Sequence, residues 1–153
     1  MLFFLFNIGD ERYALDALQI VEVLPVVGVK GIPMAPAGVA GIIDYHGVPV
    51  PLIDLSQLAL GKPARQRFGT RIIVVNYADQ KGTYHLLGLL AERANEVMRR
   101  DPAEFVASGV ENDSAPYLGP VTTDSSGMVQ WITLDRLLPL SVRDQLFTQS
   151  ASA

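Results

Sequence analysis

Short runs of apolar residues, rich in Val, Ile, Tyr and Phe, recur along the chain and are separated by Gly, Pro, Asn and Asp. This pattern is typical of short strands in a β-barrel or β-sandwich. Tight turns are expected at Gly9 and Asp10, at residues 79–82 and at Gly47. The predicted strands form two groups of five, at about 2–8, 11–15, 20–27, 40–45 and 48–53, and then at 70–78, 83–91, 93–99, 117–123 and 128–134.

Few helices are expected. Residues 36–39 are predicted to make one turn, and Asp54 to cap a turn that runs through Leu58. The last helical stretch, at about 135–147, is interrupted at Pro139, and Ser141 is able to cap the helix after it. The predicted C-terminal region, 139–153, therefore consists of a helix and a frayed tail.

A polar segment rich in Gly and Pro, residues 60–69, separates the two groups of strands and predicts a connector. The simplest architecture is two small barrels packed side by side, formed by about 1–60 and 70–138. Lys62, Arg65 and Arg67 in the connector form the only basic cluster of the chain, and we interpret it as a solvated loop.

Composition changes this picture in three ways. Only 18% of the 153 residues are charged and 49% are hydrophobic, which indicates that part of the exposed surface is apolar and suits a protein partner. A net charge of −4 argues against nucleic acid as a partner. The absence of cysteine excludes disulfides and thiolate chemistry. No apolar run is long enough for a signal sequence or a membrane span, so a cytoplasmic protein is expected.

Residues in patterns typical of catalysis are scarce. The two histidines, His46 and His85, lie far apart, and Asp44 two residues before His46 is a weak metal signal. No nucleophile elbow, phosphate-binding loop or dinucleotide fingerprint is present in the sequence. We therefore expect no catalytic residues, no metal and no cofactor, and a protein that is not an enzyme.

Three stretches of sequence, in fixed order, carry a resemblance to a known family. Residues 4–16 and the strand Ile20-Val21-Glu22-Val23 are similar to its opening hairpin and next strand. Residues 33–55 resemble its G-V-x-N-L-R-G-x-x-V-P-V-x-D-L segment, and residues 87–97 its G-x-x-V-D-x-V-x-x-V strands. The family is that of the CheW-like adaptors of bacterial chemosensory arrays, and the resemblance covers about residues 3–138, a single domain.

The resemblance implies a mainly β fold of two intertwined five-stranded SH3-like barrels with short helices. It implies a cytoplasmic scaffold, recruited to membrane-associated receptor arrays, with no catalytic activity. Members couple the cytoplasmic tip of a methyl-accepting chemotaxis receptor to the regulatory domain of a CheA-type histidine kinase. Ile20, Glu22 and Val23 match receptor-facing positions at the groove between the barrels, and His46 and Gly47 match a family turn associated with partner contacts.

The chain departs from the family at that turn. The family's Asn-Leu-Arg-Gly is Asp44-Tyr45-His46-Gly47 here, so a permanently charged guanidinium is replaced by an imidazole. Glu92 stands for the family's Asp, and Arg93 for the small residue after it. These changes leave the barrels intact but alter the partner surface. They suggest an adaptor from a divergent array, for example one that governs surface behaviour or a second-messenger output.

Alternatives remain open at this level. Ile20 and Val23 also fit an ordinary core strand, and the hairpin alone explains Gly47. A receiver-coupled adaptor or a fragment of a kinase regulatory domain would share the fold. A small-ligand-binding barrel would need a buried polar pocket with converging ionisable groups, for which the sequence shows no pattern.

Overall fold

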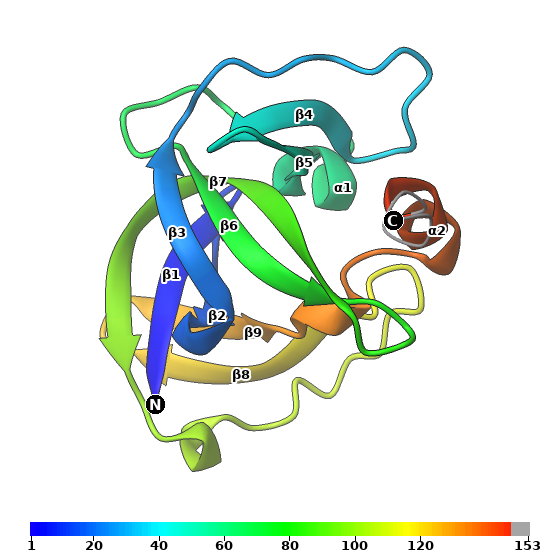
Figure 1. The fold of residues 1–153 in the computed structure, drawn as a ribbon. Coiled ribbons are helices and arrows are strands. Elements are labelled where there is room, and N and C mark those ends of the chain that lie inside the picture. Colours follow the sequence, from blue (N-terminus) through cyan, green and yellow to red (C-terminus); the bar gives the residue numbers. More distant parts are fainter. Residues whose placement is uncertain (148–153) are drawn as a thin grey trace.

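The computed structural model describes residues 1–147, and its architecture is mainly β (Figure 1). Within this range the helices are α1 (Leu55–Leu60) and α2 (Leu140–Leu146), with 3-10 turns η1 (Ala17–Gln19), η2 (Pro102–Glu104) and η3 (Leu134–Arg136). The strands of the described residues are β1 (Leu2–Ile8), β2 (Glu11–Asp16), β3 (Ile20–Pro25), β4 (Val39–Tyr45), β5 (Val48–Asp54), β6 (Arg71–Ala78), β7 (Tyr84–Arg99), β8 (Leu118–Asp124) and β9 (Gly127–Ile132).

One long strand, β7, belongs to both barrels. Its first half, up to Ala91, pairs with β6, and its second half, from Glu92, pairs with β1. The sequence predicted two strands here, 83–91 and 93–99, because polar residues interrupt the apolar run. In the structure the strand continues through Arg93, which has a positive φ of 46° and lies where the pairing of β7 passes from one barrel to the other. Figure 1 shows β7 as a single long, curved strand.

The two barrels do not follow the two halves of the chain. The first, the terminal barrel, contains β1, β2, β8, β9 and the second half of β7. The second, the central barrel, contains β3 to β6 and the first half of β7. The expected division into 1–60 and 70–138 therefore differs from the pairing, because β1 and β2 find their partners near the C-terminus. The segment 60–69 connects α1 to β6 within the central barrel.

The largest core cluster joins the two barrels. It includes Phe6 and Leu15 from the terminal barrel, Ile53 and Tyr77 from the central barrel, and Val142 of α2. The Tyr77 hydroxyl donates to the carbonyl of Asp135 (3.2 Å) and accepts from the backbone N–H of Leu138 (3.2 Å), which fixes the segment before α2. A smaller cluster fills each barrel, around Leu52 in the central one and around Phe3 in the terminal one.

The predicted helix signals are confirmed in part. The Asp54 carboxylate accepts from the backbone N–H groups of Ser56 and Gln57, as expected of a cap, and also from that of Ala64. The turn at 36–39 is present, since the N–H of Val39 donates to the carbonyl of Pro36. Helix α2 starts directly after Pro139 without a side-chain cap, so the prediction for Ser141 is wrong. The predicted frayed tail, residues 150–153, lies outside the described residues. No helix within 1–147 is long and apolar enough to cross a membrane.

Candidate functional site

The turn between β4 and β5 consists of His46 and Gly47. Both residues have positive φ, 52° and 84°, and the flanking Tyr45 and Val48 pair across the hairpin. A two-residue loop of this kind matches the twist of the strands and favours glycine at its second position. The Asp44 carboxylate accepts from the N–H of Gly47 (2.8 Å) and holds the turn closed. The imidazole of His46 is 75% exposed as a result.

The central barrel brings Glu22 of β3 to this turn. The Tyr45 hydroxyl donates to Oε1 of Glu22 (2.7 Å), and Nε2 of His46 lies 3.6 Å from the same oxygen. The Tyr45 and His46 rings contact edge to face, with centroids 4.5 Å apart. Glu22, Tyr45, His46 and Gly47 thus form one surface feature, the turn cluster, which bridges two strands that do not pair with each other.

The chemistry of the turn cluster depends on the Glu22 carboxylate. Its hydrogen bond, together with partial burial, raises the pKa of Tyr45 above the usual tyrosine value, so the hydroxyl stays a donor at physiological pH. At 3.6 Å the contact with His46 is too long for a hydrogen bond and becomes an ion pair only when the imidazole is protonated. The cluster is suited to recognition by charge and shape.

The two apolar positions predicted to face the groove, Ile20 and Val23, lie partly in the core. Ile20 and Val23 are half-buried and pack against the largest core cluster, opposite Val75 and Ile73 of β6. Val21, in the irregularity between Ile20 and Glu22, is instead 43% exposed. The structure therefore brings Glu22, His46 and Gly47 together at the surface. Ile20 and Val23 instead pack between β3 and the core.

A second exposed apolar position beside β3 was missed by sequence reasoning. Leu18 is 89% exposed because the Asp16 carboxylate accepts from its N–H and fixes the turn η1. Leu18, Gln19, Asn76 and Tyr84 line a shallow hollow where β3 begins. The only available signal was an isolated leucine after a capping aspartate, which is a common pattern.

The two histidines and Asp44 do not take part in a metal-ligating cluster. Among residues 1–147, no three His, Cys, Asp or Glu side chains are grouped so that they could hold a metal ion. The Asp44 carboxylate is engaged by the Gly47 N–H within the turn. His85 is largely buried: its Nε2 lies 2.7 Å from Oδ2 of Asp79, and its ring stacks on Phe147.

Comparison with known proteins decides the family. The family model of the CheW-like domain matches residues 2–141. The chain belongs to the CheW-like family. No curated protein matches the chain. Among solved structures, the scaffolding protein TtCheW from Thermoanaerobacter tengcongensis has 24% sequence identity and a TM-score of 0.78, over 92% of this chain and 89% of that one.

These findings confirm the predicted fold. The CheW-like match spans both barrels, and the strands of each barrel are contributed as the resemblance implied, by intertwined parts of the chain. Within the CheW-like domain, the turn cluster lies at the hairpin of β4 and β5, where the sequence departs from the family pattern at Asp44, Tyr45 and His46.

Proposed function

We propose that this protein is a scaffold that couples the cytoplasmic tip of a methyl-accepting chemotaxis receptor to the regulatory domain of a CheA-type histidine kinase. Family membership over residues 2–141 supports the adaptor class. The observation that carries the finer proposal is the turn cluster. It presents His46 on the β4–β5 hairpin beside Glu22 of β3, and both positions match partner-contact residues of the family by resemblance.

The receptor would bind along β3. A helical hairpin offers apolar side chains, and Leu18 in η1 and Val21 in β3 are exposed apolar groups of this segment, whereas Ile20 and Val23 pack on the core. Ile20 and Val23 pack on the core and so hold the backbone of the exposed apolar residues in place. In the proposal these two residues therefore have a positioning role.

The turn cluster would contribute the polar part of the partner surface. A scaffold of this kind acts without a catalytic step, by binding one arrangement of receptor and kinase more tightly than another. In this proposal the protein works in the cytoplasm and is recruited to receptor arrays at the membrane. The departures at Asp44, Tyr45 and His46 suit an array other than the flagellar one, such as one for surface behaviour or second-messenger output.

The proposal is tested by titrating the purified protein with a receptor cytoplasmic hairpin. Leu18→Asp places a charge where the apolar contact is expected and should weaken binding at least tenfold, or about 1.4 kcal/mol or more. Met128→Asp, an exposed apolar position on β9 of the terminal barrel, is the matched control and should bind as the unchanged protein does. Equal affinities for all three proteins would contradict the proposed receptor surface.

A further inference from the structure

The segment between α1 and β6, residues 61–70, together with Arg71 at the start of β6, has an unusual composition for this chain. It holds Lys62, Arg65, Arg67 and Arg71 and no acidic residue, although the protein as a whole carries a net charge of −4. It lies in the central barrel but plays no part in the turn cluster or in the surface around Leu18. The sequence alone suggested a solvated loop.

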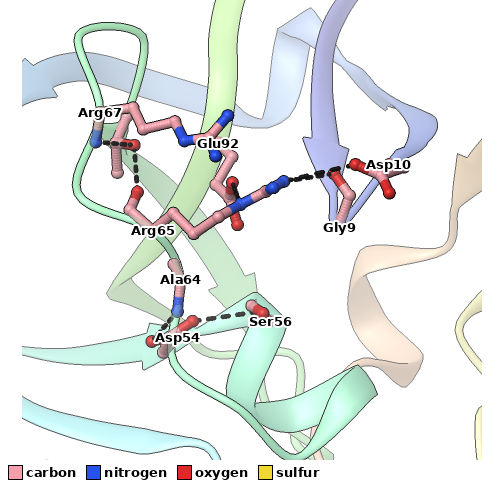
Figure 2. Close-up of polar contacts among 9 residues, drawn as sticks. Gly9, Asp10, Asp54, Ser56, Ala64, Arg65, Arg67 and Glu92 are labelled. Carbon is pink, nitrogen blue, oxygen red and sulfur yellow. Dashed lines mark hydrogen bonds and ion pairs between the residues drawn. The ribbon is translucent and has the colours of Figure 1, made fainter.

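The structure shows that this connector is firmly held. The Arg65 guanidinium donates through Nε to Oε1 of the buried Glu92 (2.7 Å), and its Nη2 reaches the carbonyl of Gly9 (3.3 Å) and the carboxylate of Asp10 (3.5 Å) (Figure 2). The Thr70 hydroxyl donates to the Arg65 carbonyl (2.6 Å) and accepts from the N–H of Arg67 (3.1 Å). A loop ordered in this way loses little entropy on binding.

Phe68 is presented by this ordered loop. Its side chain is 95% exposed, and the Arg71 guanidinium lies over its ring, 5.9 Å from the centroid, while Arg71 also donates to the Phe68 carbonyl. Single exposed apolar residues are common and need no explanation alone. An exposed aromatic ring on an ordered loop is, however, the kind of side chain that anchors protein interfaces.

A cleft of about 610 Å³ adjoins Phe68. Its walls include Arg67 and Gly69 of the connector and Arg93 and Glu96 of β7. Arg93 has a positive φ within a strand, a conformation that is strained for a bulky residue and that often marks a functional site. The carbonyl of Gly69 accepts from the N–H of Ala94 (2.9 Å), which locks the connector against this strained position.

The charges of the cleft indicate its ligand. Arg12, also on its wall, is engaged by a bidentate pair with Asp124. Arg67 and Arg93 show no side-chain hydrogen bond or ion pair with any of residues 1–147. Two unengaged guanidinium groups beside an exposed aromatic ring offer bidentate sites for carboxylates and an apolar anchor.

We propose that this cleft docks an acidic segment of a partner protein, with carboxylates on Arg67 and Arg93 and an aliphatic side chain against Phe68. Nucleic acid and anionic membranes are disfavoured, because they bind through many phosphates and only two guanidinium groups of the cleft, Arg67 and Arg93, are unengaged among the described residues. The contact is separate from the turn cluster and from the surface around Leu18, so it goes beyond the proposed coupling role.

The test is an NMR titration of the full-length ¹⁵N-labelled protein with a synthetic 12-residue peptide of alternating Glu and Leu. We expect saturable shifts of the amide signals of residues 66–70 and 92–96. A peptide with Lys in place of Glu should give none, and one with Ser in place of Leu should bind at least fivefold more weakly. Phe68→Ser and Arg67→Glu should each weaken binding of the Glu–Leu peptide at least fivefold. Lys81→Glu, the same charge reversal on the β6–β7 turn, is the matched control and should not change it.

Three results would overturn the proposal. The first is the absence of shifts around the cleft, and the second is an equal response to the Glu and Lys peptides. The third is co-sedimentation with phosphatidylglycerol vesicles that depends on Phe68 while the peptide has no effect, which would assign the loop to a membrane surface. Thermal melting of each variant verifies folding, and Arg67→Gln replaces Arg67→Glu if the reversal unfolds the protein. Neither receptor nor kinase enters the titration, so its outcome is independent of the coupling role.

Discussion

His46 shows how one side chain can keep a fold and change a surface. Its positive φ and the hydrogen bond from Gly47 to Asp44 define the hairpin, and any residue tolerated in that conformation would leave the barrel intact. The group presented to a partner is different: a guanidinium is always charged, whereas an imidazole is charged only when protonated. Glu22, 3.6 Å away, is already a carboxylate within reach.

The first prediction concerns this charge. If the turn meets an acidic partner surface, a permanently charged guanidinium binds it better than an imidazole does. His46→Arg should therefore tighten binding severalfold. Calorimetric titration of both proteins against the receptor hairpin and, separately, the kinase domain measures this. Unchanged or weaker binding of His46→Arg to both partners would eliminate the charge-pairing idea.

The second prediction separates the two interpretations of β3. Ile20→Asp buries a charge against the core and should lower the free energy of unfolding by about 2 kcal/mol or more. Val21→Asp changes an exposed position and should alter it by less than about 0.5 kcal/mol. Urea denaturation of both variants gives the comparison. Equal stability of the two variants would mean that Ile20 lies at the surface, as the resemblance first suggested.

At the scale of elements, the sequence predicted features set by neighbouring residues better than it predicted which strands lie together. The Asp54 cap could be inferred because the carboxylate and the N–H groups of Ser56 and Gln57 lie within three residues. The contact of Glu22 with Tyr45 could not, because it requires β3 and β4 to approach each other through a closed barrel. A break between strands was predicted at Glu92, since polarity alone does not distinguish a turn from a strand that continues through one residue of positive φ, Arg93.

The third prediction concerns the ion pair that ties β2 to the β8–β9 hairpin. Arg12 donates to both carboxylate oxygens of Asp124 (2.7 and 2.9 Å), which lowers the pKa of Asp124 from 3.8 to about 2. The folded state therefore binds fewer protons than the unfolded state, so the stabilisation is present above about pH 4 and is lost as the pH falls towards 2.

Asp124→Asn should lower the free energy of unfolding by about 1 kcal/mol at neutral pH, because the pair is partly exposed to solvent. The difference from the unchanged protein should disappear near pH 2. Urea melts at several pH values measure it, with Asp113→Asn in an exposed loop as the matched control. A stability difference that persists unchanged at this low pH would show that the carboxylate contributes through packing or backbone bonds instead.

On the scale of the whole molecule, intertwining of the barrels was implied by the family resemblance and not by the strand pattern. Counting strands gave two groups of five, but only the pairing of β1 with β7 and of β2 with β9 shows that both chain ends build one barrel. Because the largest core cluster crosses from one barrel to the other, the surface around Leu18, the turn cluster and the connector cleft belong to one rigid unit. A scaffold needs this rigidity to transmit the position of one partner to another.

The most direct test of the coupling role is whether one protein molecule holds both partners at once. The purified protein is mixed with the receptor cytoplasmic hairpin and the kinase regulatory domain, and the mass of the complex is measured by analytical ultracentrifugation. We expect a ternary species that requires this protein and that Leu18→Asp reduces to the complex with the kinase domain alone. Binding of the two partners in mutually exclusive binary complexes, or of neither, would contradict the coupling role.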